Sequence, residues 1–193
     1  PSSLTVVASS TTAEVSWLAV ETTPARPVTG YRVFRNGVQV CQVDQTSCSD
    51  VGLSAGTAYE FQIATFGPAG QGPLSAVTPV TSLGVPTMVA ANGGDANATV
   101  TWAQPSATGN SAIIRYEIRH STDNGSSWSP PVLTTGPTSS HVVTGLENHT
   151  EYVFSVRAVN GVGAGTWSSN STPVRVLDPY GVEVLADAPV GFW

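Results

Sequence analysis

Three stretches of the sequence occur twice in the same order, and this internal repeat limits the possible folds more than any other feature. The segment AEVSWLA at 13–19 matches ATVTWAQ at 98–104, and GYRVFRNG at 30–37 matches RYEIRHSTDNG at 115–125, both at an offset of 85 residues. The third match, 52–72 with 145–165, has an offset of 93 residues. Two copies of one structural unit are therefore expected. The second copy carries eight more residues, which fall around STDNGSSWSPPVLTTGP.

Each copy shows the period-two alternation of β-strands. In AEVSWLA, Val15 and Trp17 point to one side, and the residues between and beside them point to the other. The same pattern recurs in both copies of the longest apolar strand, at Tyr59, Phe61 and Ile63 and at Tyr152, Phe154, Val156 and Ala158. Asn-Gly and Gly-Pro pairs at 36–37, 67–68, 124–125 and 160–161 mark turns. About seven strands per roughly 90 residues predicts an all-β chain of two sandwiches.

The landmarks also resemble a known family. A Trp in the second strand (Trp17, Trp102), a Tyr opening the third (Tyr31, Tyr116) and the pattern GL-x5-Y-x-F before a Gly-rich loop are similar to fibronectin type III domains. The resemblance implies two tandem immunoglobulin-like, seven-stranded β-sandwiches at 1–82 and 83–178. It implies that these four residues are structural core. Tyr59 and Tyr152 would form the tyrosine corners, in which the hydroxyl bonds nearby backbone and the ring fills the core.

The two cysteines, Cys41 and Cys48, are close in sequence, in VCQVDQTSCSD. Placed on that fold, they lie on the short fourth strand and on the next strand, which belongs to the opposite sheet. A disulfide here would close a small loop and stabilise the sandwich by about 2–3 kcal/mol. Two buried free thiols are the alternative. A metal site is disfavoured, because the C-x2-C spacing and a neighbouring His are both missing.

Charge excludes several classes of function. The formal net charge is -6, and all seven positive residues are Arg, scattered along the chain. A nucleic-acid partner requires a clustered basic footprint, which the sequence does not show. It has neither a basic amphipathic segment for a membrane surface nor an apolar run of roughly 20 residues for a membrane span. We therefore expect neither nucleic-acid binding nor membrane insertion.

The sequence offers no catalytic motif or cofactor site. His120, His141 and His149 lie at unrelated positions, G-x-S-x-G and H-E-x-x-H are missing, and no carboxylate pair stands out. We expect a non-enzymatic chain without a cofactor. The sequons at Asn97, Asn124, Asn148 and Asn170 would be used in a secreted eukaryotic protein. The lack of Lys beside abundant Ala, Gly, Val and Arg favours a GC-rich bacterial or phage source, in which they stay unused.

Candidate binding residues are aromatic. Trp128 and Trp167 could stack on sugar rings if exposed, although packing of both rings on the sheet is the simpler expectation. The Gly-rich loops 66–73 and 160–167 lie where fibronectin type III domains often present binding residues, but neither contains Arg-Gly-Asp. Positive φ in a tight turn is the structural explanation for their glycines.

The last twelve residues, VEVLADAPVGFW, follow the end of the second copy near Leu177. The stretch VLADAPVGFW resembles the opening of laminin-G/concanavalin-like jelly-roll domains, which implies that 179–193 is a linker and first strand of a following domain. Alternatively, the tail packs on the second sandwich or adds to a sheet edge of a partner. We expect Phe192 and Trp193 to be buried against another chain or poorly ordered, and they are also candidate binding residues.

These observations lead to two main functional hypotheses, which we favour over a receptor-type module that binds a protein partner through the sandwich loops. The first is a structural spacer or adhesion module of a larger extracellular, cell-surface or virion protein, such as a phage tail appendage, which presents a lectin-like domain to a host or glycan. The second is an accessory region of a secreted polysaccharide-degrading enzyme. In both, the expected partners are other domains or chains of a larger assembly, with cell-surface glycan as a further candidate.

Overall fold

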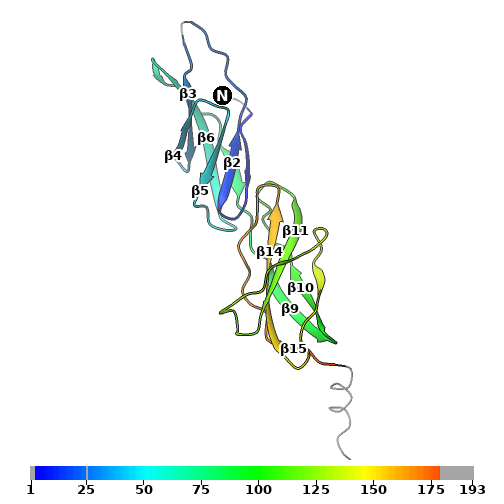
Figure 1. Cartoon of the computed structure of the whole chain (residues 1–193). Coiled ribbons are helices and arrows are strands. Elements are labelled where there is room, and N and C mark those ends of the chain that lie inside the picture. Colours follow the sequence, from blue (N-terminus) through cyan, green and yellow to red (C-terminus); the bar gives the residue numbers. More distant parts are fainter. Residues whose placement is uncertain (1–2, 25, 179–193) are drawn as a thin grey trace, which may run out of the picture. The chain divides into compact units, whose positions relative to one another are not determined.

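The computed structural model describes residues 3–24 and 26–178. These residues form fifteen strands and no helix, which confirms the predicted all-β class (Figure 1). None of the described segments could therefore cross a lipid bilayer as a helix. The chain divides into two compact units. The first comprises Pro1–Val85, Pro105–Ile114 and Val159–Thr166, and the second comprises Pro86–Gln104, Arg115–Ala158 and the segment that begins at Trp167. The assignment of 179–193 to a following domain lies outside the described residues.

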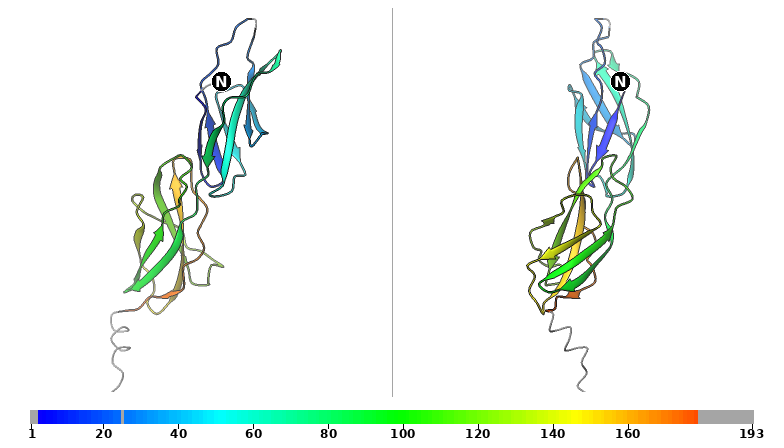
Figure 2. Two further views of the ribbon diagram at one scale, coloured as in Figure 1. Left: turned by 180° about the vertical axis from the view of Figure 1, so that it is seen from behind. Right: turned by 90° about the vertical axis from the view of Figure 1, so that its right-hand side faces the viewer.

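The first unit is a two-layered sandwich of antiparallel strands (Figure 2). One sheet has the order β1 (Thr5–Ala8), β2 (Thr12–Ser16) and β5 (Ser47–Val51). The other has the order β4 (Val38–Val43), β3 (Gly30–Arg35), β6 (Ala58–Gly67) and β7 (Gly70–Gln71), and β8 (Thr78–Thr81) also pairs with β6. Val15, Phe61 and Ile63, which the alternation predicted to face the core, are fully buried between the sheets, together with Val33.

The second unit repeats this arrangement. Its first sheet has the order β13 (Ser140–Thr144), β10 (Asn97–Ala103) and β9 (Thr87–Gly94). Its second sheet has the order β12 (Val132–Leu133), β11 (Ile113–Ser121), β14 (Glu151–Asn160) and β15 (Val174–Arg175). Val100, Ile118, Phe154 and Val156 form the centre of the core. The eight additional residues fall between β11 and β13, where β12 is only two residues long.

The aromatic landmarks occupy equivalent places in both units. Trp17 packs against Tyr31 with ring centroids 5.3 Å apart, and Trp102 packs against Tyr116 at 5.1 Å. All four rings are buried. Burial raises the pKa of Tyr116. Each Trp–Tyr pair therefore connects the two sheets of its own sandwich.

Both tyrosine corners are present. The backbone N–H of Ser54 donates to the Tyr59 hydroxyl at 2.8 Å, and that of Glu147 donates to the Tyr152 hydroxyl at 3.0 Å. The bond spans five residues in each unit. Tyr152 is buried, whereas Tyr59 is half-buried and packs against the edge of the core.

The glycines of the 66–73 loop have two different explanations. Gly70 adopts a φ of 96°, as expected for a turn. Gly67 is required by a close approach instead, because a Cβ there would lie 2.1 Å from the carbonyl oxygen of Pro27. A side chain at Gly67 would push the β6–β7 hairpin away from the loop that precedes β3.

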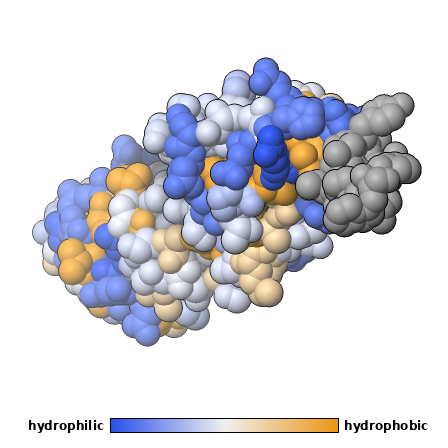
Figure 3. Space-filling view, turned by 90° about the horizontal axis from the view of Figure 1, so that it is seen from below, coloured by the Kyte–Doolittle hydropathy of each residue, from blue (hydrophilic) through white to orange (hydrophobic). Residues whose placement is uncertain are grey.

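Exposed hydrophobic residues are dispersed. On the face drawn in Figure 3, hydrophobic patches alternate with hydrophilic ones. The most exposed large side chain is that of Met88, at 84%, followed by Val51 and Val38. Met88 has a φ of 52° and lies where β9 and β10 change register, so its exposure belongs to a β-bulge.

Candidate binding surface

The outer face of β11 and β14 brings together three arginines and a glutamate. Arg115, Glu117 and Arg119 alternate along β11, so all three point away from the core that Tyr116 and Ile118 enter. Arg157 lies on the neighbouring strand β14 and contacts Glu117 directly. The fold thereby brings together three arginines that look scattered in the sequence.

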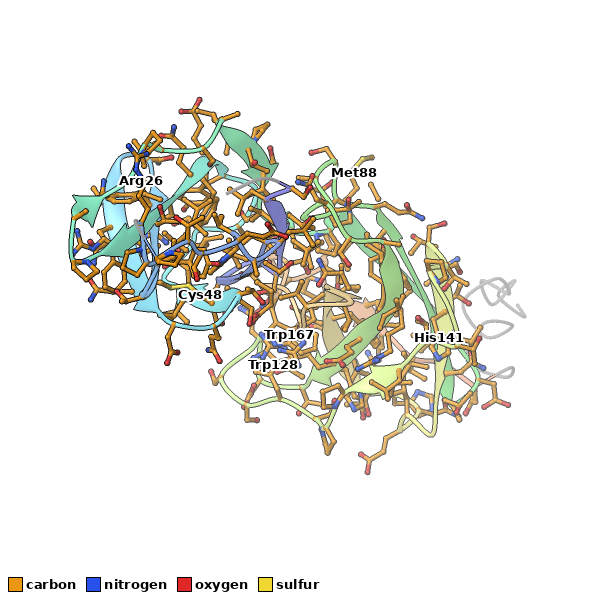
Figure 4. The ribbon with its side chains drawn as sticks, turned by 90° about the horizontal axis from the view of Figure 1, so that it is seen from above. Arg26, Cys48, Met88, Trp128, His141 and Trp167 are labelled. Carbon is orange, nitrogen blue, oxygen red and sulfur yellow. A yellow bond between two sulfur atoms is a disulfide. The ribbon has the colours of Figure 1, made fainter. Side chains whose placement is uncertain are left out.

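Trp128 and Trp167 lie side by side on this face (Figure 4). The Arg119 guanidinium lies 4.0 Å from the centre of the Trp128 ring and 4.2 Å from that of Trp167. The Arg157 guanidinium lies 4.5 Å from the Trp167 ring. These distances are well within the range of cation–π attraction. We call the resulting row the Trp–Arg ladder; it consists of Trp128, Arg119, Trp167, Arg157, Glu117 and Arg115.

Glu117 anchors the ladder electrostatically. Arg157 donates to its Oε2 through Nη2 at 2.6 Å and Nε at 2.8 Å, and Arg115 donates to its Oε1 at 3.2 Å. The carboxylate is buried, and removal of either partner would weaken the compensation of its charge. One carboxylate thus serves two guanidinium groups, and the third, on Arg119, makes only ring contacts.

Burial and a neighbouring positive charge both act on the pKa of Arg119. Burial lowers the pKa of Arg119, and the neighbouring charge of Arg157 lowers it further. An arginine remains protonated under such shifts, because its ordinary pKa lies far above neutral pH. The Trp–Arg ladder therefore keeps three positive charges against the one negative charge of Glu117.

Serine hydroxyls position Trp167. Ser168 donates its N–H to the Val156 carbonyl at 2.9 Å, and its hydroxyl accepts the Val156 N–H at 3.0 Å. Ser171 makes the same pair of bonds with Phe154, at 2.8 and 3.0 Å. The segment after the Gly-rich loop therefore runs along β14 through side-chain bonds, and this fixes Trp167 above the sheet.

The loop between β11 and β12 positions Trp128. Asp123 accepts hydrogen bonds from the Ser121 hydroxyl at 2.6 Å and from the Ser127 N–H at 2.8 Å, which hold the pKa of its carboxyl well below the usual range. Ser129 donates its N–H to the His120 carbonyl at 2.9 Å. These bonds fold the loop back so that Trp128 covers Arg119.

A hollow of about 480 Å³ adjoins Trp128. Its aromatic lining includes His120 and Tyr152, whose rings meet edge to face at 5.4 Å. Burial lowers the pKa of His120, which favours the neutral imidazole. The hollow also has hydroxyl groups around it, those of Ser121, Thr122, Ser127 and Ser129. It combines aromatic rings with hydrogen-bonding groups, as ligand pockets commonly do.

The cysteines form the predicted disulfide. Cys41 on β4 and Cys48 on β5 are bonded, with their Cα atoms 6.6 Å apart. Because β4 and β5 belong to different sheets, the bond joins the two layers of the first sandwich. In the second unit, His141 occupies the position equivalent to Cys48. Val15 pairs with Cys48 in the first unit, and the equivalent Val100 pairs with His141 in the second. Val132 occupies the position equivalent to Cys41, because Val33 pairs with Cys41 and the equivalent Ile118 pairs with Val132.

The structure places the remaining candidates as follows. Trp128 and Trp167 are half-buried and brought together, each with a ring face on an arginine. The two Gly-rich loops, 66–73 and 160–167, contain no charged residue. Phe192 and Trp193 lie outside the described residues. Within residues 3–24 and 26–178, no three metal-ligating side chains gather. Sequence reasoning missed Arg115, Glu117, Arg119 and Arg157, although the alternation of charge in RYEIR would have revealed three of them.

Comparison with known proteins identifies the family. The profile of the fibronectin type III domain matches residues 1–81 and 84–174. Exoglucanase B of Cellulomonas fimi is 32% identical over an alignment of 181 residues that covers 88% of this chain and 16% of that protein. Endoglucanase B of Cellulomonas fimi is 33% identical over 181 residues, covering 86% of this chain and 16% of that protein. The human interleukin-6 receptor subunit beta is 39% identical over 71 residues, covering 36% of this chain and 8% of that protein. The chain thus spans a small part of each relative, and it belongs to the fibronectin type III domain family.

Proposed function

We propose that the chain is a non-catalytic spacer in a larger extracellular protein, and that this protein degrades polysaccharide. The observation that carries the proposal is the extent of the match to two such enzymes. Exoglucanase B and endoglucanase B align with 88% and 86% of this chain, so the tandem pair corresponds as a whole. A part that amounts to 16% of each relative leaves most of its length for other domains.

The disulfide supports an extracellular location. Disulfides persist in oxidising compartments and are rare in the cytosol. The Cys41–Cys48 bond joins both sheets of the first sandwich, so it belongs to the folded domain. The receptor subunit among the relatives is consistent with a location outside the cell.

A chimeric enzyme tests the spacer function. The chain is placed between a cellulase catalytic domain and a cellulose-binding domain, and compared with a Gly/Ser linker of equal length. We expect equal activity on soluble substrate and higher activity on insoluble cellulose for the chimera with the folded spacer, because a Gly/Ser chain collapses to a shorter mean distance. Reducing-sugar release by the isolated chain, or equal activity of both chimeras on insoluble cellulose, would contradict the proposal.

A second candidate setting is a virion or cell-surface protein that presents a lectin-like domain. The segment VLADAPVGFW favours it, through its similarity to the start of laminin-G-like domains. The gene that encodes the chain distinguishes the two settings. A glycoside hydrolase domain in the same reading frame supports the enzyme, whereas a jelly-roll domain directly after Trp193 beside phage tail genes supports the virion protein.

A further inference from the structure

We propose that the outer face of the sheet β12-β11-β14-β15 binds a polyanionic polysaccharide through Arg115, Arg119 and Arg157. This goes beyond the spacer function, which requires no ligand. The ligand chemistry is a chain of sugar rings that carries carboxylate or sulfate groups.

The distribution of charge points to an anionic ligand. The whole chain has seven positive and thirteen negative side chains, yet three of the seven arginines lie on this one face. Glu117 is the carboxylate among them. A protein with a net charge of -6 repels polyanions in general, so binding of one requires a local surface of this kind.

Exposure separates the positive groups from the negative one. The side chain of Arg115 is 37% exposed and that of Arg157 is 27% exposed, whereas that of Glu117 is 8% exposed. A ligand that approaches the Trp–Arg ladder therefore meets guanidinium groups first and the Glu117 carboxylate last; the exposed Glu151 lies at the other end of β14, six residues before Arg157. Asp123, the nearest acidic residue in the adjoining loop, is held by hydrogen bonds from Ser121 and Ser127.

The guanidinium groups have donors to spare. Each guanidinium has five N–H bonds in a fork that matches carboxylate and sulfate oxygens. Arg115 uses one nitrogen on Glu117, and Arg119 makes ring contacts without a hydrogen bond to any described residue. The Trp rings hold Arg119 in place, so little side-chain entropy would be lost when it binds an anion.

The surroundings favour a sugar over an acidic peptide. Trp128 forms one end of the ladder and also lines the hollow of about 480 Å³, where ring faces and side-chain hydroxyls meet. Sugar rings combine C–H faces, which pack on aromatic rings, with hydroxyls that need hydrogen-bond partners. A sugar chain could therefore place its acidic groups on the arginines and a neighbouring ring in the hollow.

Native affinity electrophoresis of the full chain tests the proposal. The gels contain polygalacturonate for the carboxylate, dextran sulfate for the sulfate, hydroxyethyl cellulose as the neutral polymer, and poly-glutamate as the acidic polypeptide. We expect retardation by polygalacturonate or dextran sulfate, reversed by 0.5 M NaCl, roughly the range in which phosphate-type contacts are lost. The gel that retards the chain identifies the acidic group.

Variants locate the surface. Arg115→Gln leaves Glu117 paired with Arg157, and should weaken binding at least threefold; Arg115→Gln with Arg119→Gln should weaken it at least tenfold. Arg26→Gln, in an exposed loop of the first sandwich, makes the same change in charge and should have no effect (Figure 4). Circular dichroism melts verify that each variant is folded.

Three results would overturn the proposal. The first is migration in both acidic-polysaccharide gels equal to that in hydroxyethyl cellulose. The second is equal loss of binding in Arg26→Gln and Arg115→Gln, which would indicate a general charge effect. The third is stronger retardation by poly-glutamate than by either polysaccharide, which would assign the surface to an acidic polypeptide. None of these results bears on the spacer function, which the chimeric enzymes test separately.

Discussion

Where the first domain exposes Leu74 to solvent, the second places Trp167 between two guanidinium groups. The positions are equivalent, because Ser75 and Ser168, the next residues, make the same bonds to Ile63 and Val156. The repeat likewise places Arg119 where the first domain has Phe34, and Arg157 where it has Ala64. One core thus carries the Trp–Arg ladder in the second copy and uncharged side chains at these three equivalent positions in the first, where Arg32 lies over the Phe66 ring instead.

At the edges of the two sandwiches, it is the first domain that has the additional bond. The first domain joins its sheets with the Cys41–Cys48 bond, and the second has Val132 and His141 at the same register positions. Arg35 lies over the Tyr59 ring in the first domain, whereas His120 packs on Tyr152 in the second. The comparison teaches that this core fixes the fold, and that each copy secures its periphery with separate chemistry.

Removal of the covalent bond should give the largest effect. Cys41→Ala with Cys48→Ala should destabilise the first domain by about 2–3 kcal/mol, because a short closed loop no longer limits the unfolded chain. The second domain should be unaffected. Chemical denaturation followed by NMR, with the Trp17 and Trp102 indole signals as separate probes, measures both domains in the full chain. Equal losses in both domains would show that their stabilities are coupled.

Removal of the central ring of the ladder should rank second. Trp167→Ala eliminates two cation–π contacts and should cost the second domain about 2 kcal/mol. The matched change in the first domain, Leu74→Ala, should cost under about 0.5 kcal/mol, because that side chain is largely solvated. The same denaturation experiment measures both. Similar costs for the two variants would remove the energetic distinction between the two outer faces.

Transfer of the disulfide should have a smaller effect. Val132→Cys with His141→Cys places cysteines at the positions that register assigns to Cys41 and Cys48. We expect a bond to form on oxidation and to stabilise the second domain by about 1 kcal/mol, less than a native disulfide because the surrounding backbone has not adapted to it. Thiol titration and melts with and without reductant measure the outcome. Two free thiols after oxidation would show that the sheets of the two domains have different spacing at this edge.

The smallest expected effect is a dependence on pH. Burial lowers the pKa of His120 below its ordinary value of 6.5, so the unfolded chain takes up the proton first as the pH falls. The second domain should therefore lose stability below about pH 6.5, down to the lower pKa of the folded form. His120→Phe should remove this slope. The first domain has Arg35 at the position equivalent to His120, so this position should contribute no loss of stability with falling pH there. An unchanged slope in His120→Phe would assign the effect to other groups.

Asp50 should act in the opposite direction in the first domain. Burial raises the pKa of its carboxyl, partly offset by Arg35, which bonds it at 2.9 Å. Because the folded form then binds the proton more readily, the contribution of Asp50 to stability is present at low pH and lost as the pH rises above its unfolded value of 3.8. Melts of Asp50→Asn against the unmodified chain between pH 3 and pH 7 would detect it.

The core was predictable from sequence because its residues repeat. Trp17 and Trp102, or Tyr59 and Tyr152, follow from alternation and from a constant offset between copies. The disulfide was predictable because the fold that the aromatic landmarks resemble places Cys41 and Cys48 on successive strands of opposite sheets. The ladder was not, because Trp128 lies in the insertion without a counterpart in the first copy, and Arg157 and Trp167 meet Arg119 only through strand pairing. A repeat reveals what two copies share, and the binding surface lies where they differ.

The Cys41–Cys48 bond also has a mechanical consequence. When a tandem array is stretched, each domain that unfolds releases the contour length of its chain. The seven peptide units between the cysteines could extend to roughly 25 Å, but the bond keeps their Cα atoms 6.6 Å apart. Single-molecule force spectroscopy should therefore record a step for the first domain that is shorter by about 2 nm than its residue count implies. Reductant would restore that length, so the redox state of the surroundings would set how far the protein can extend under load.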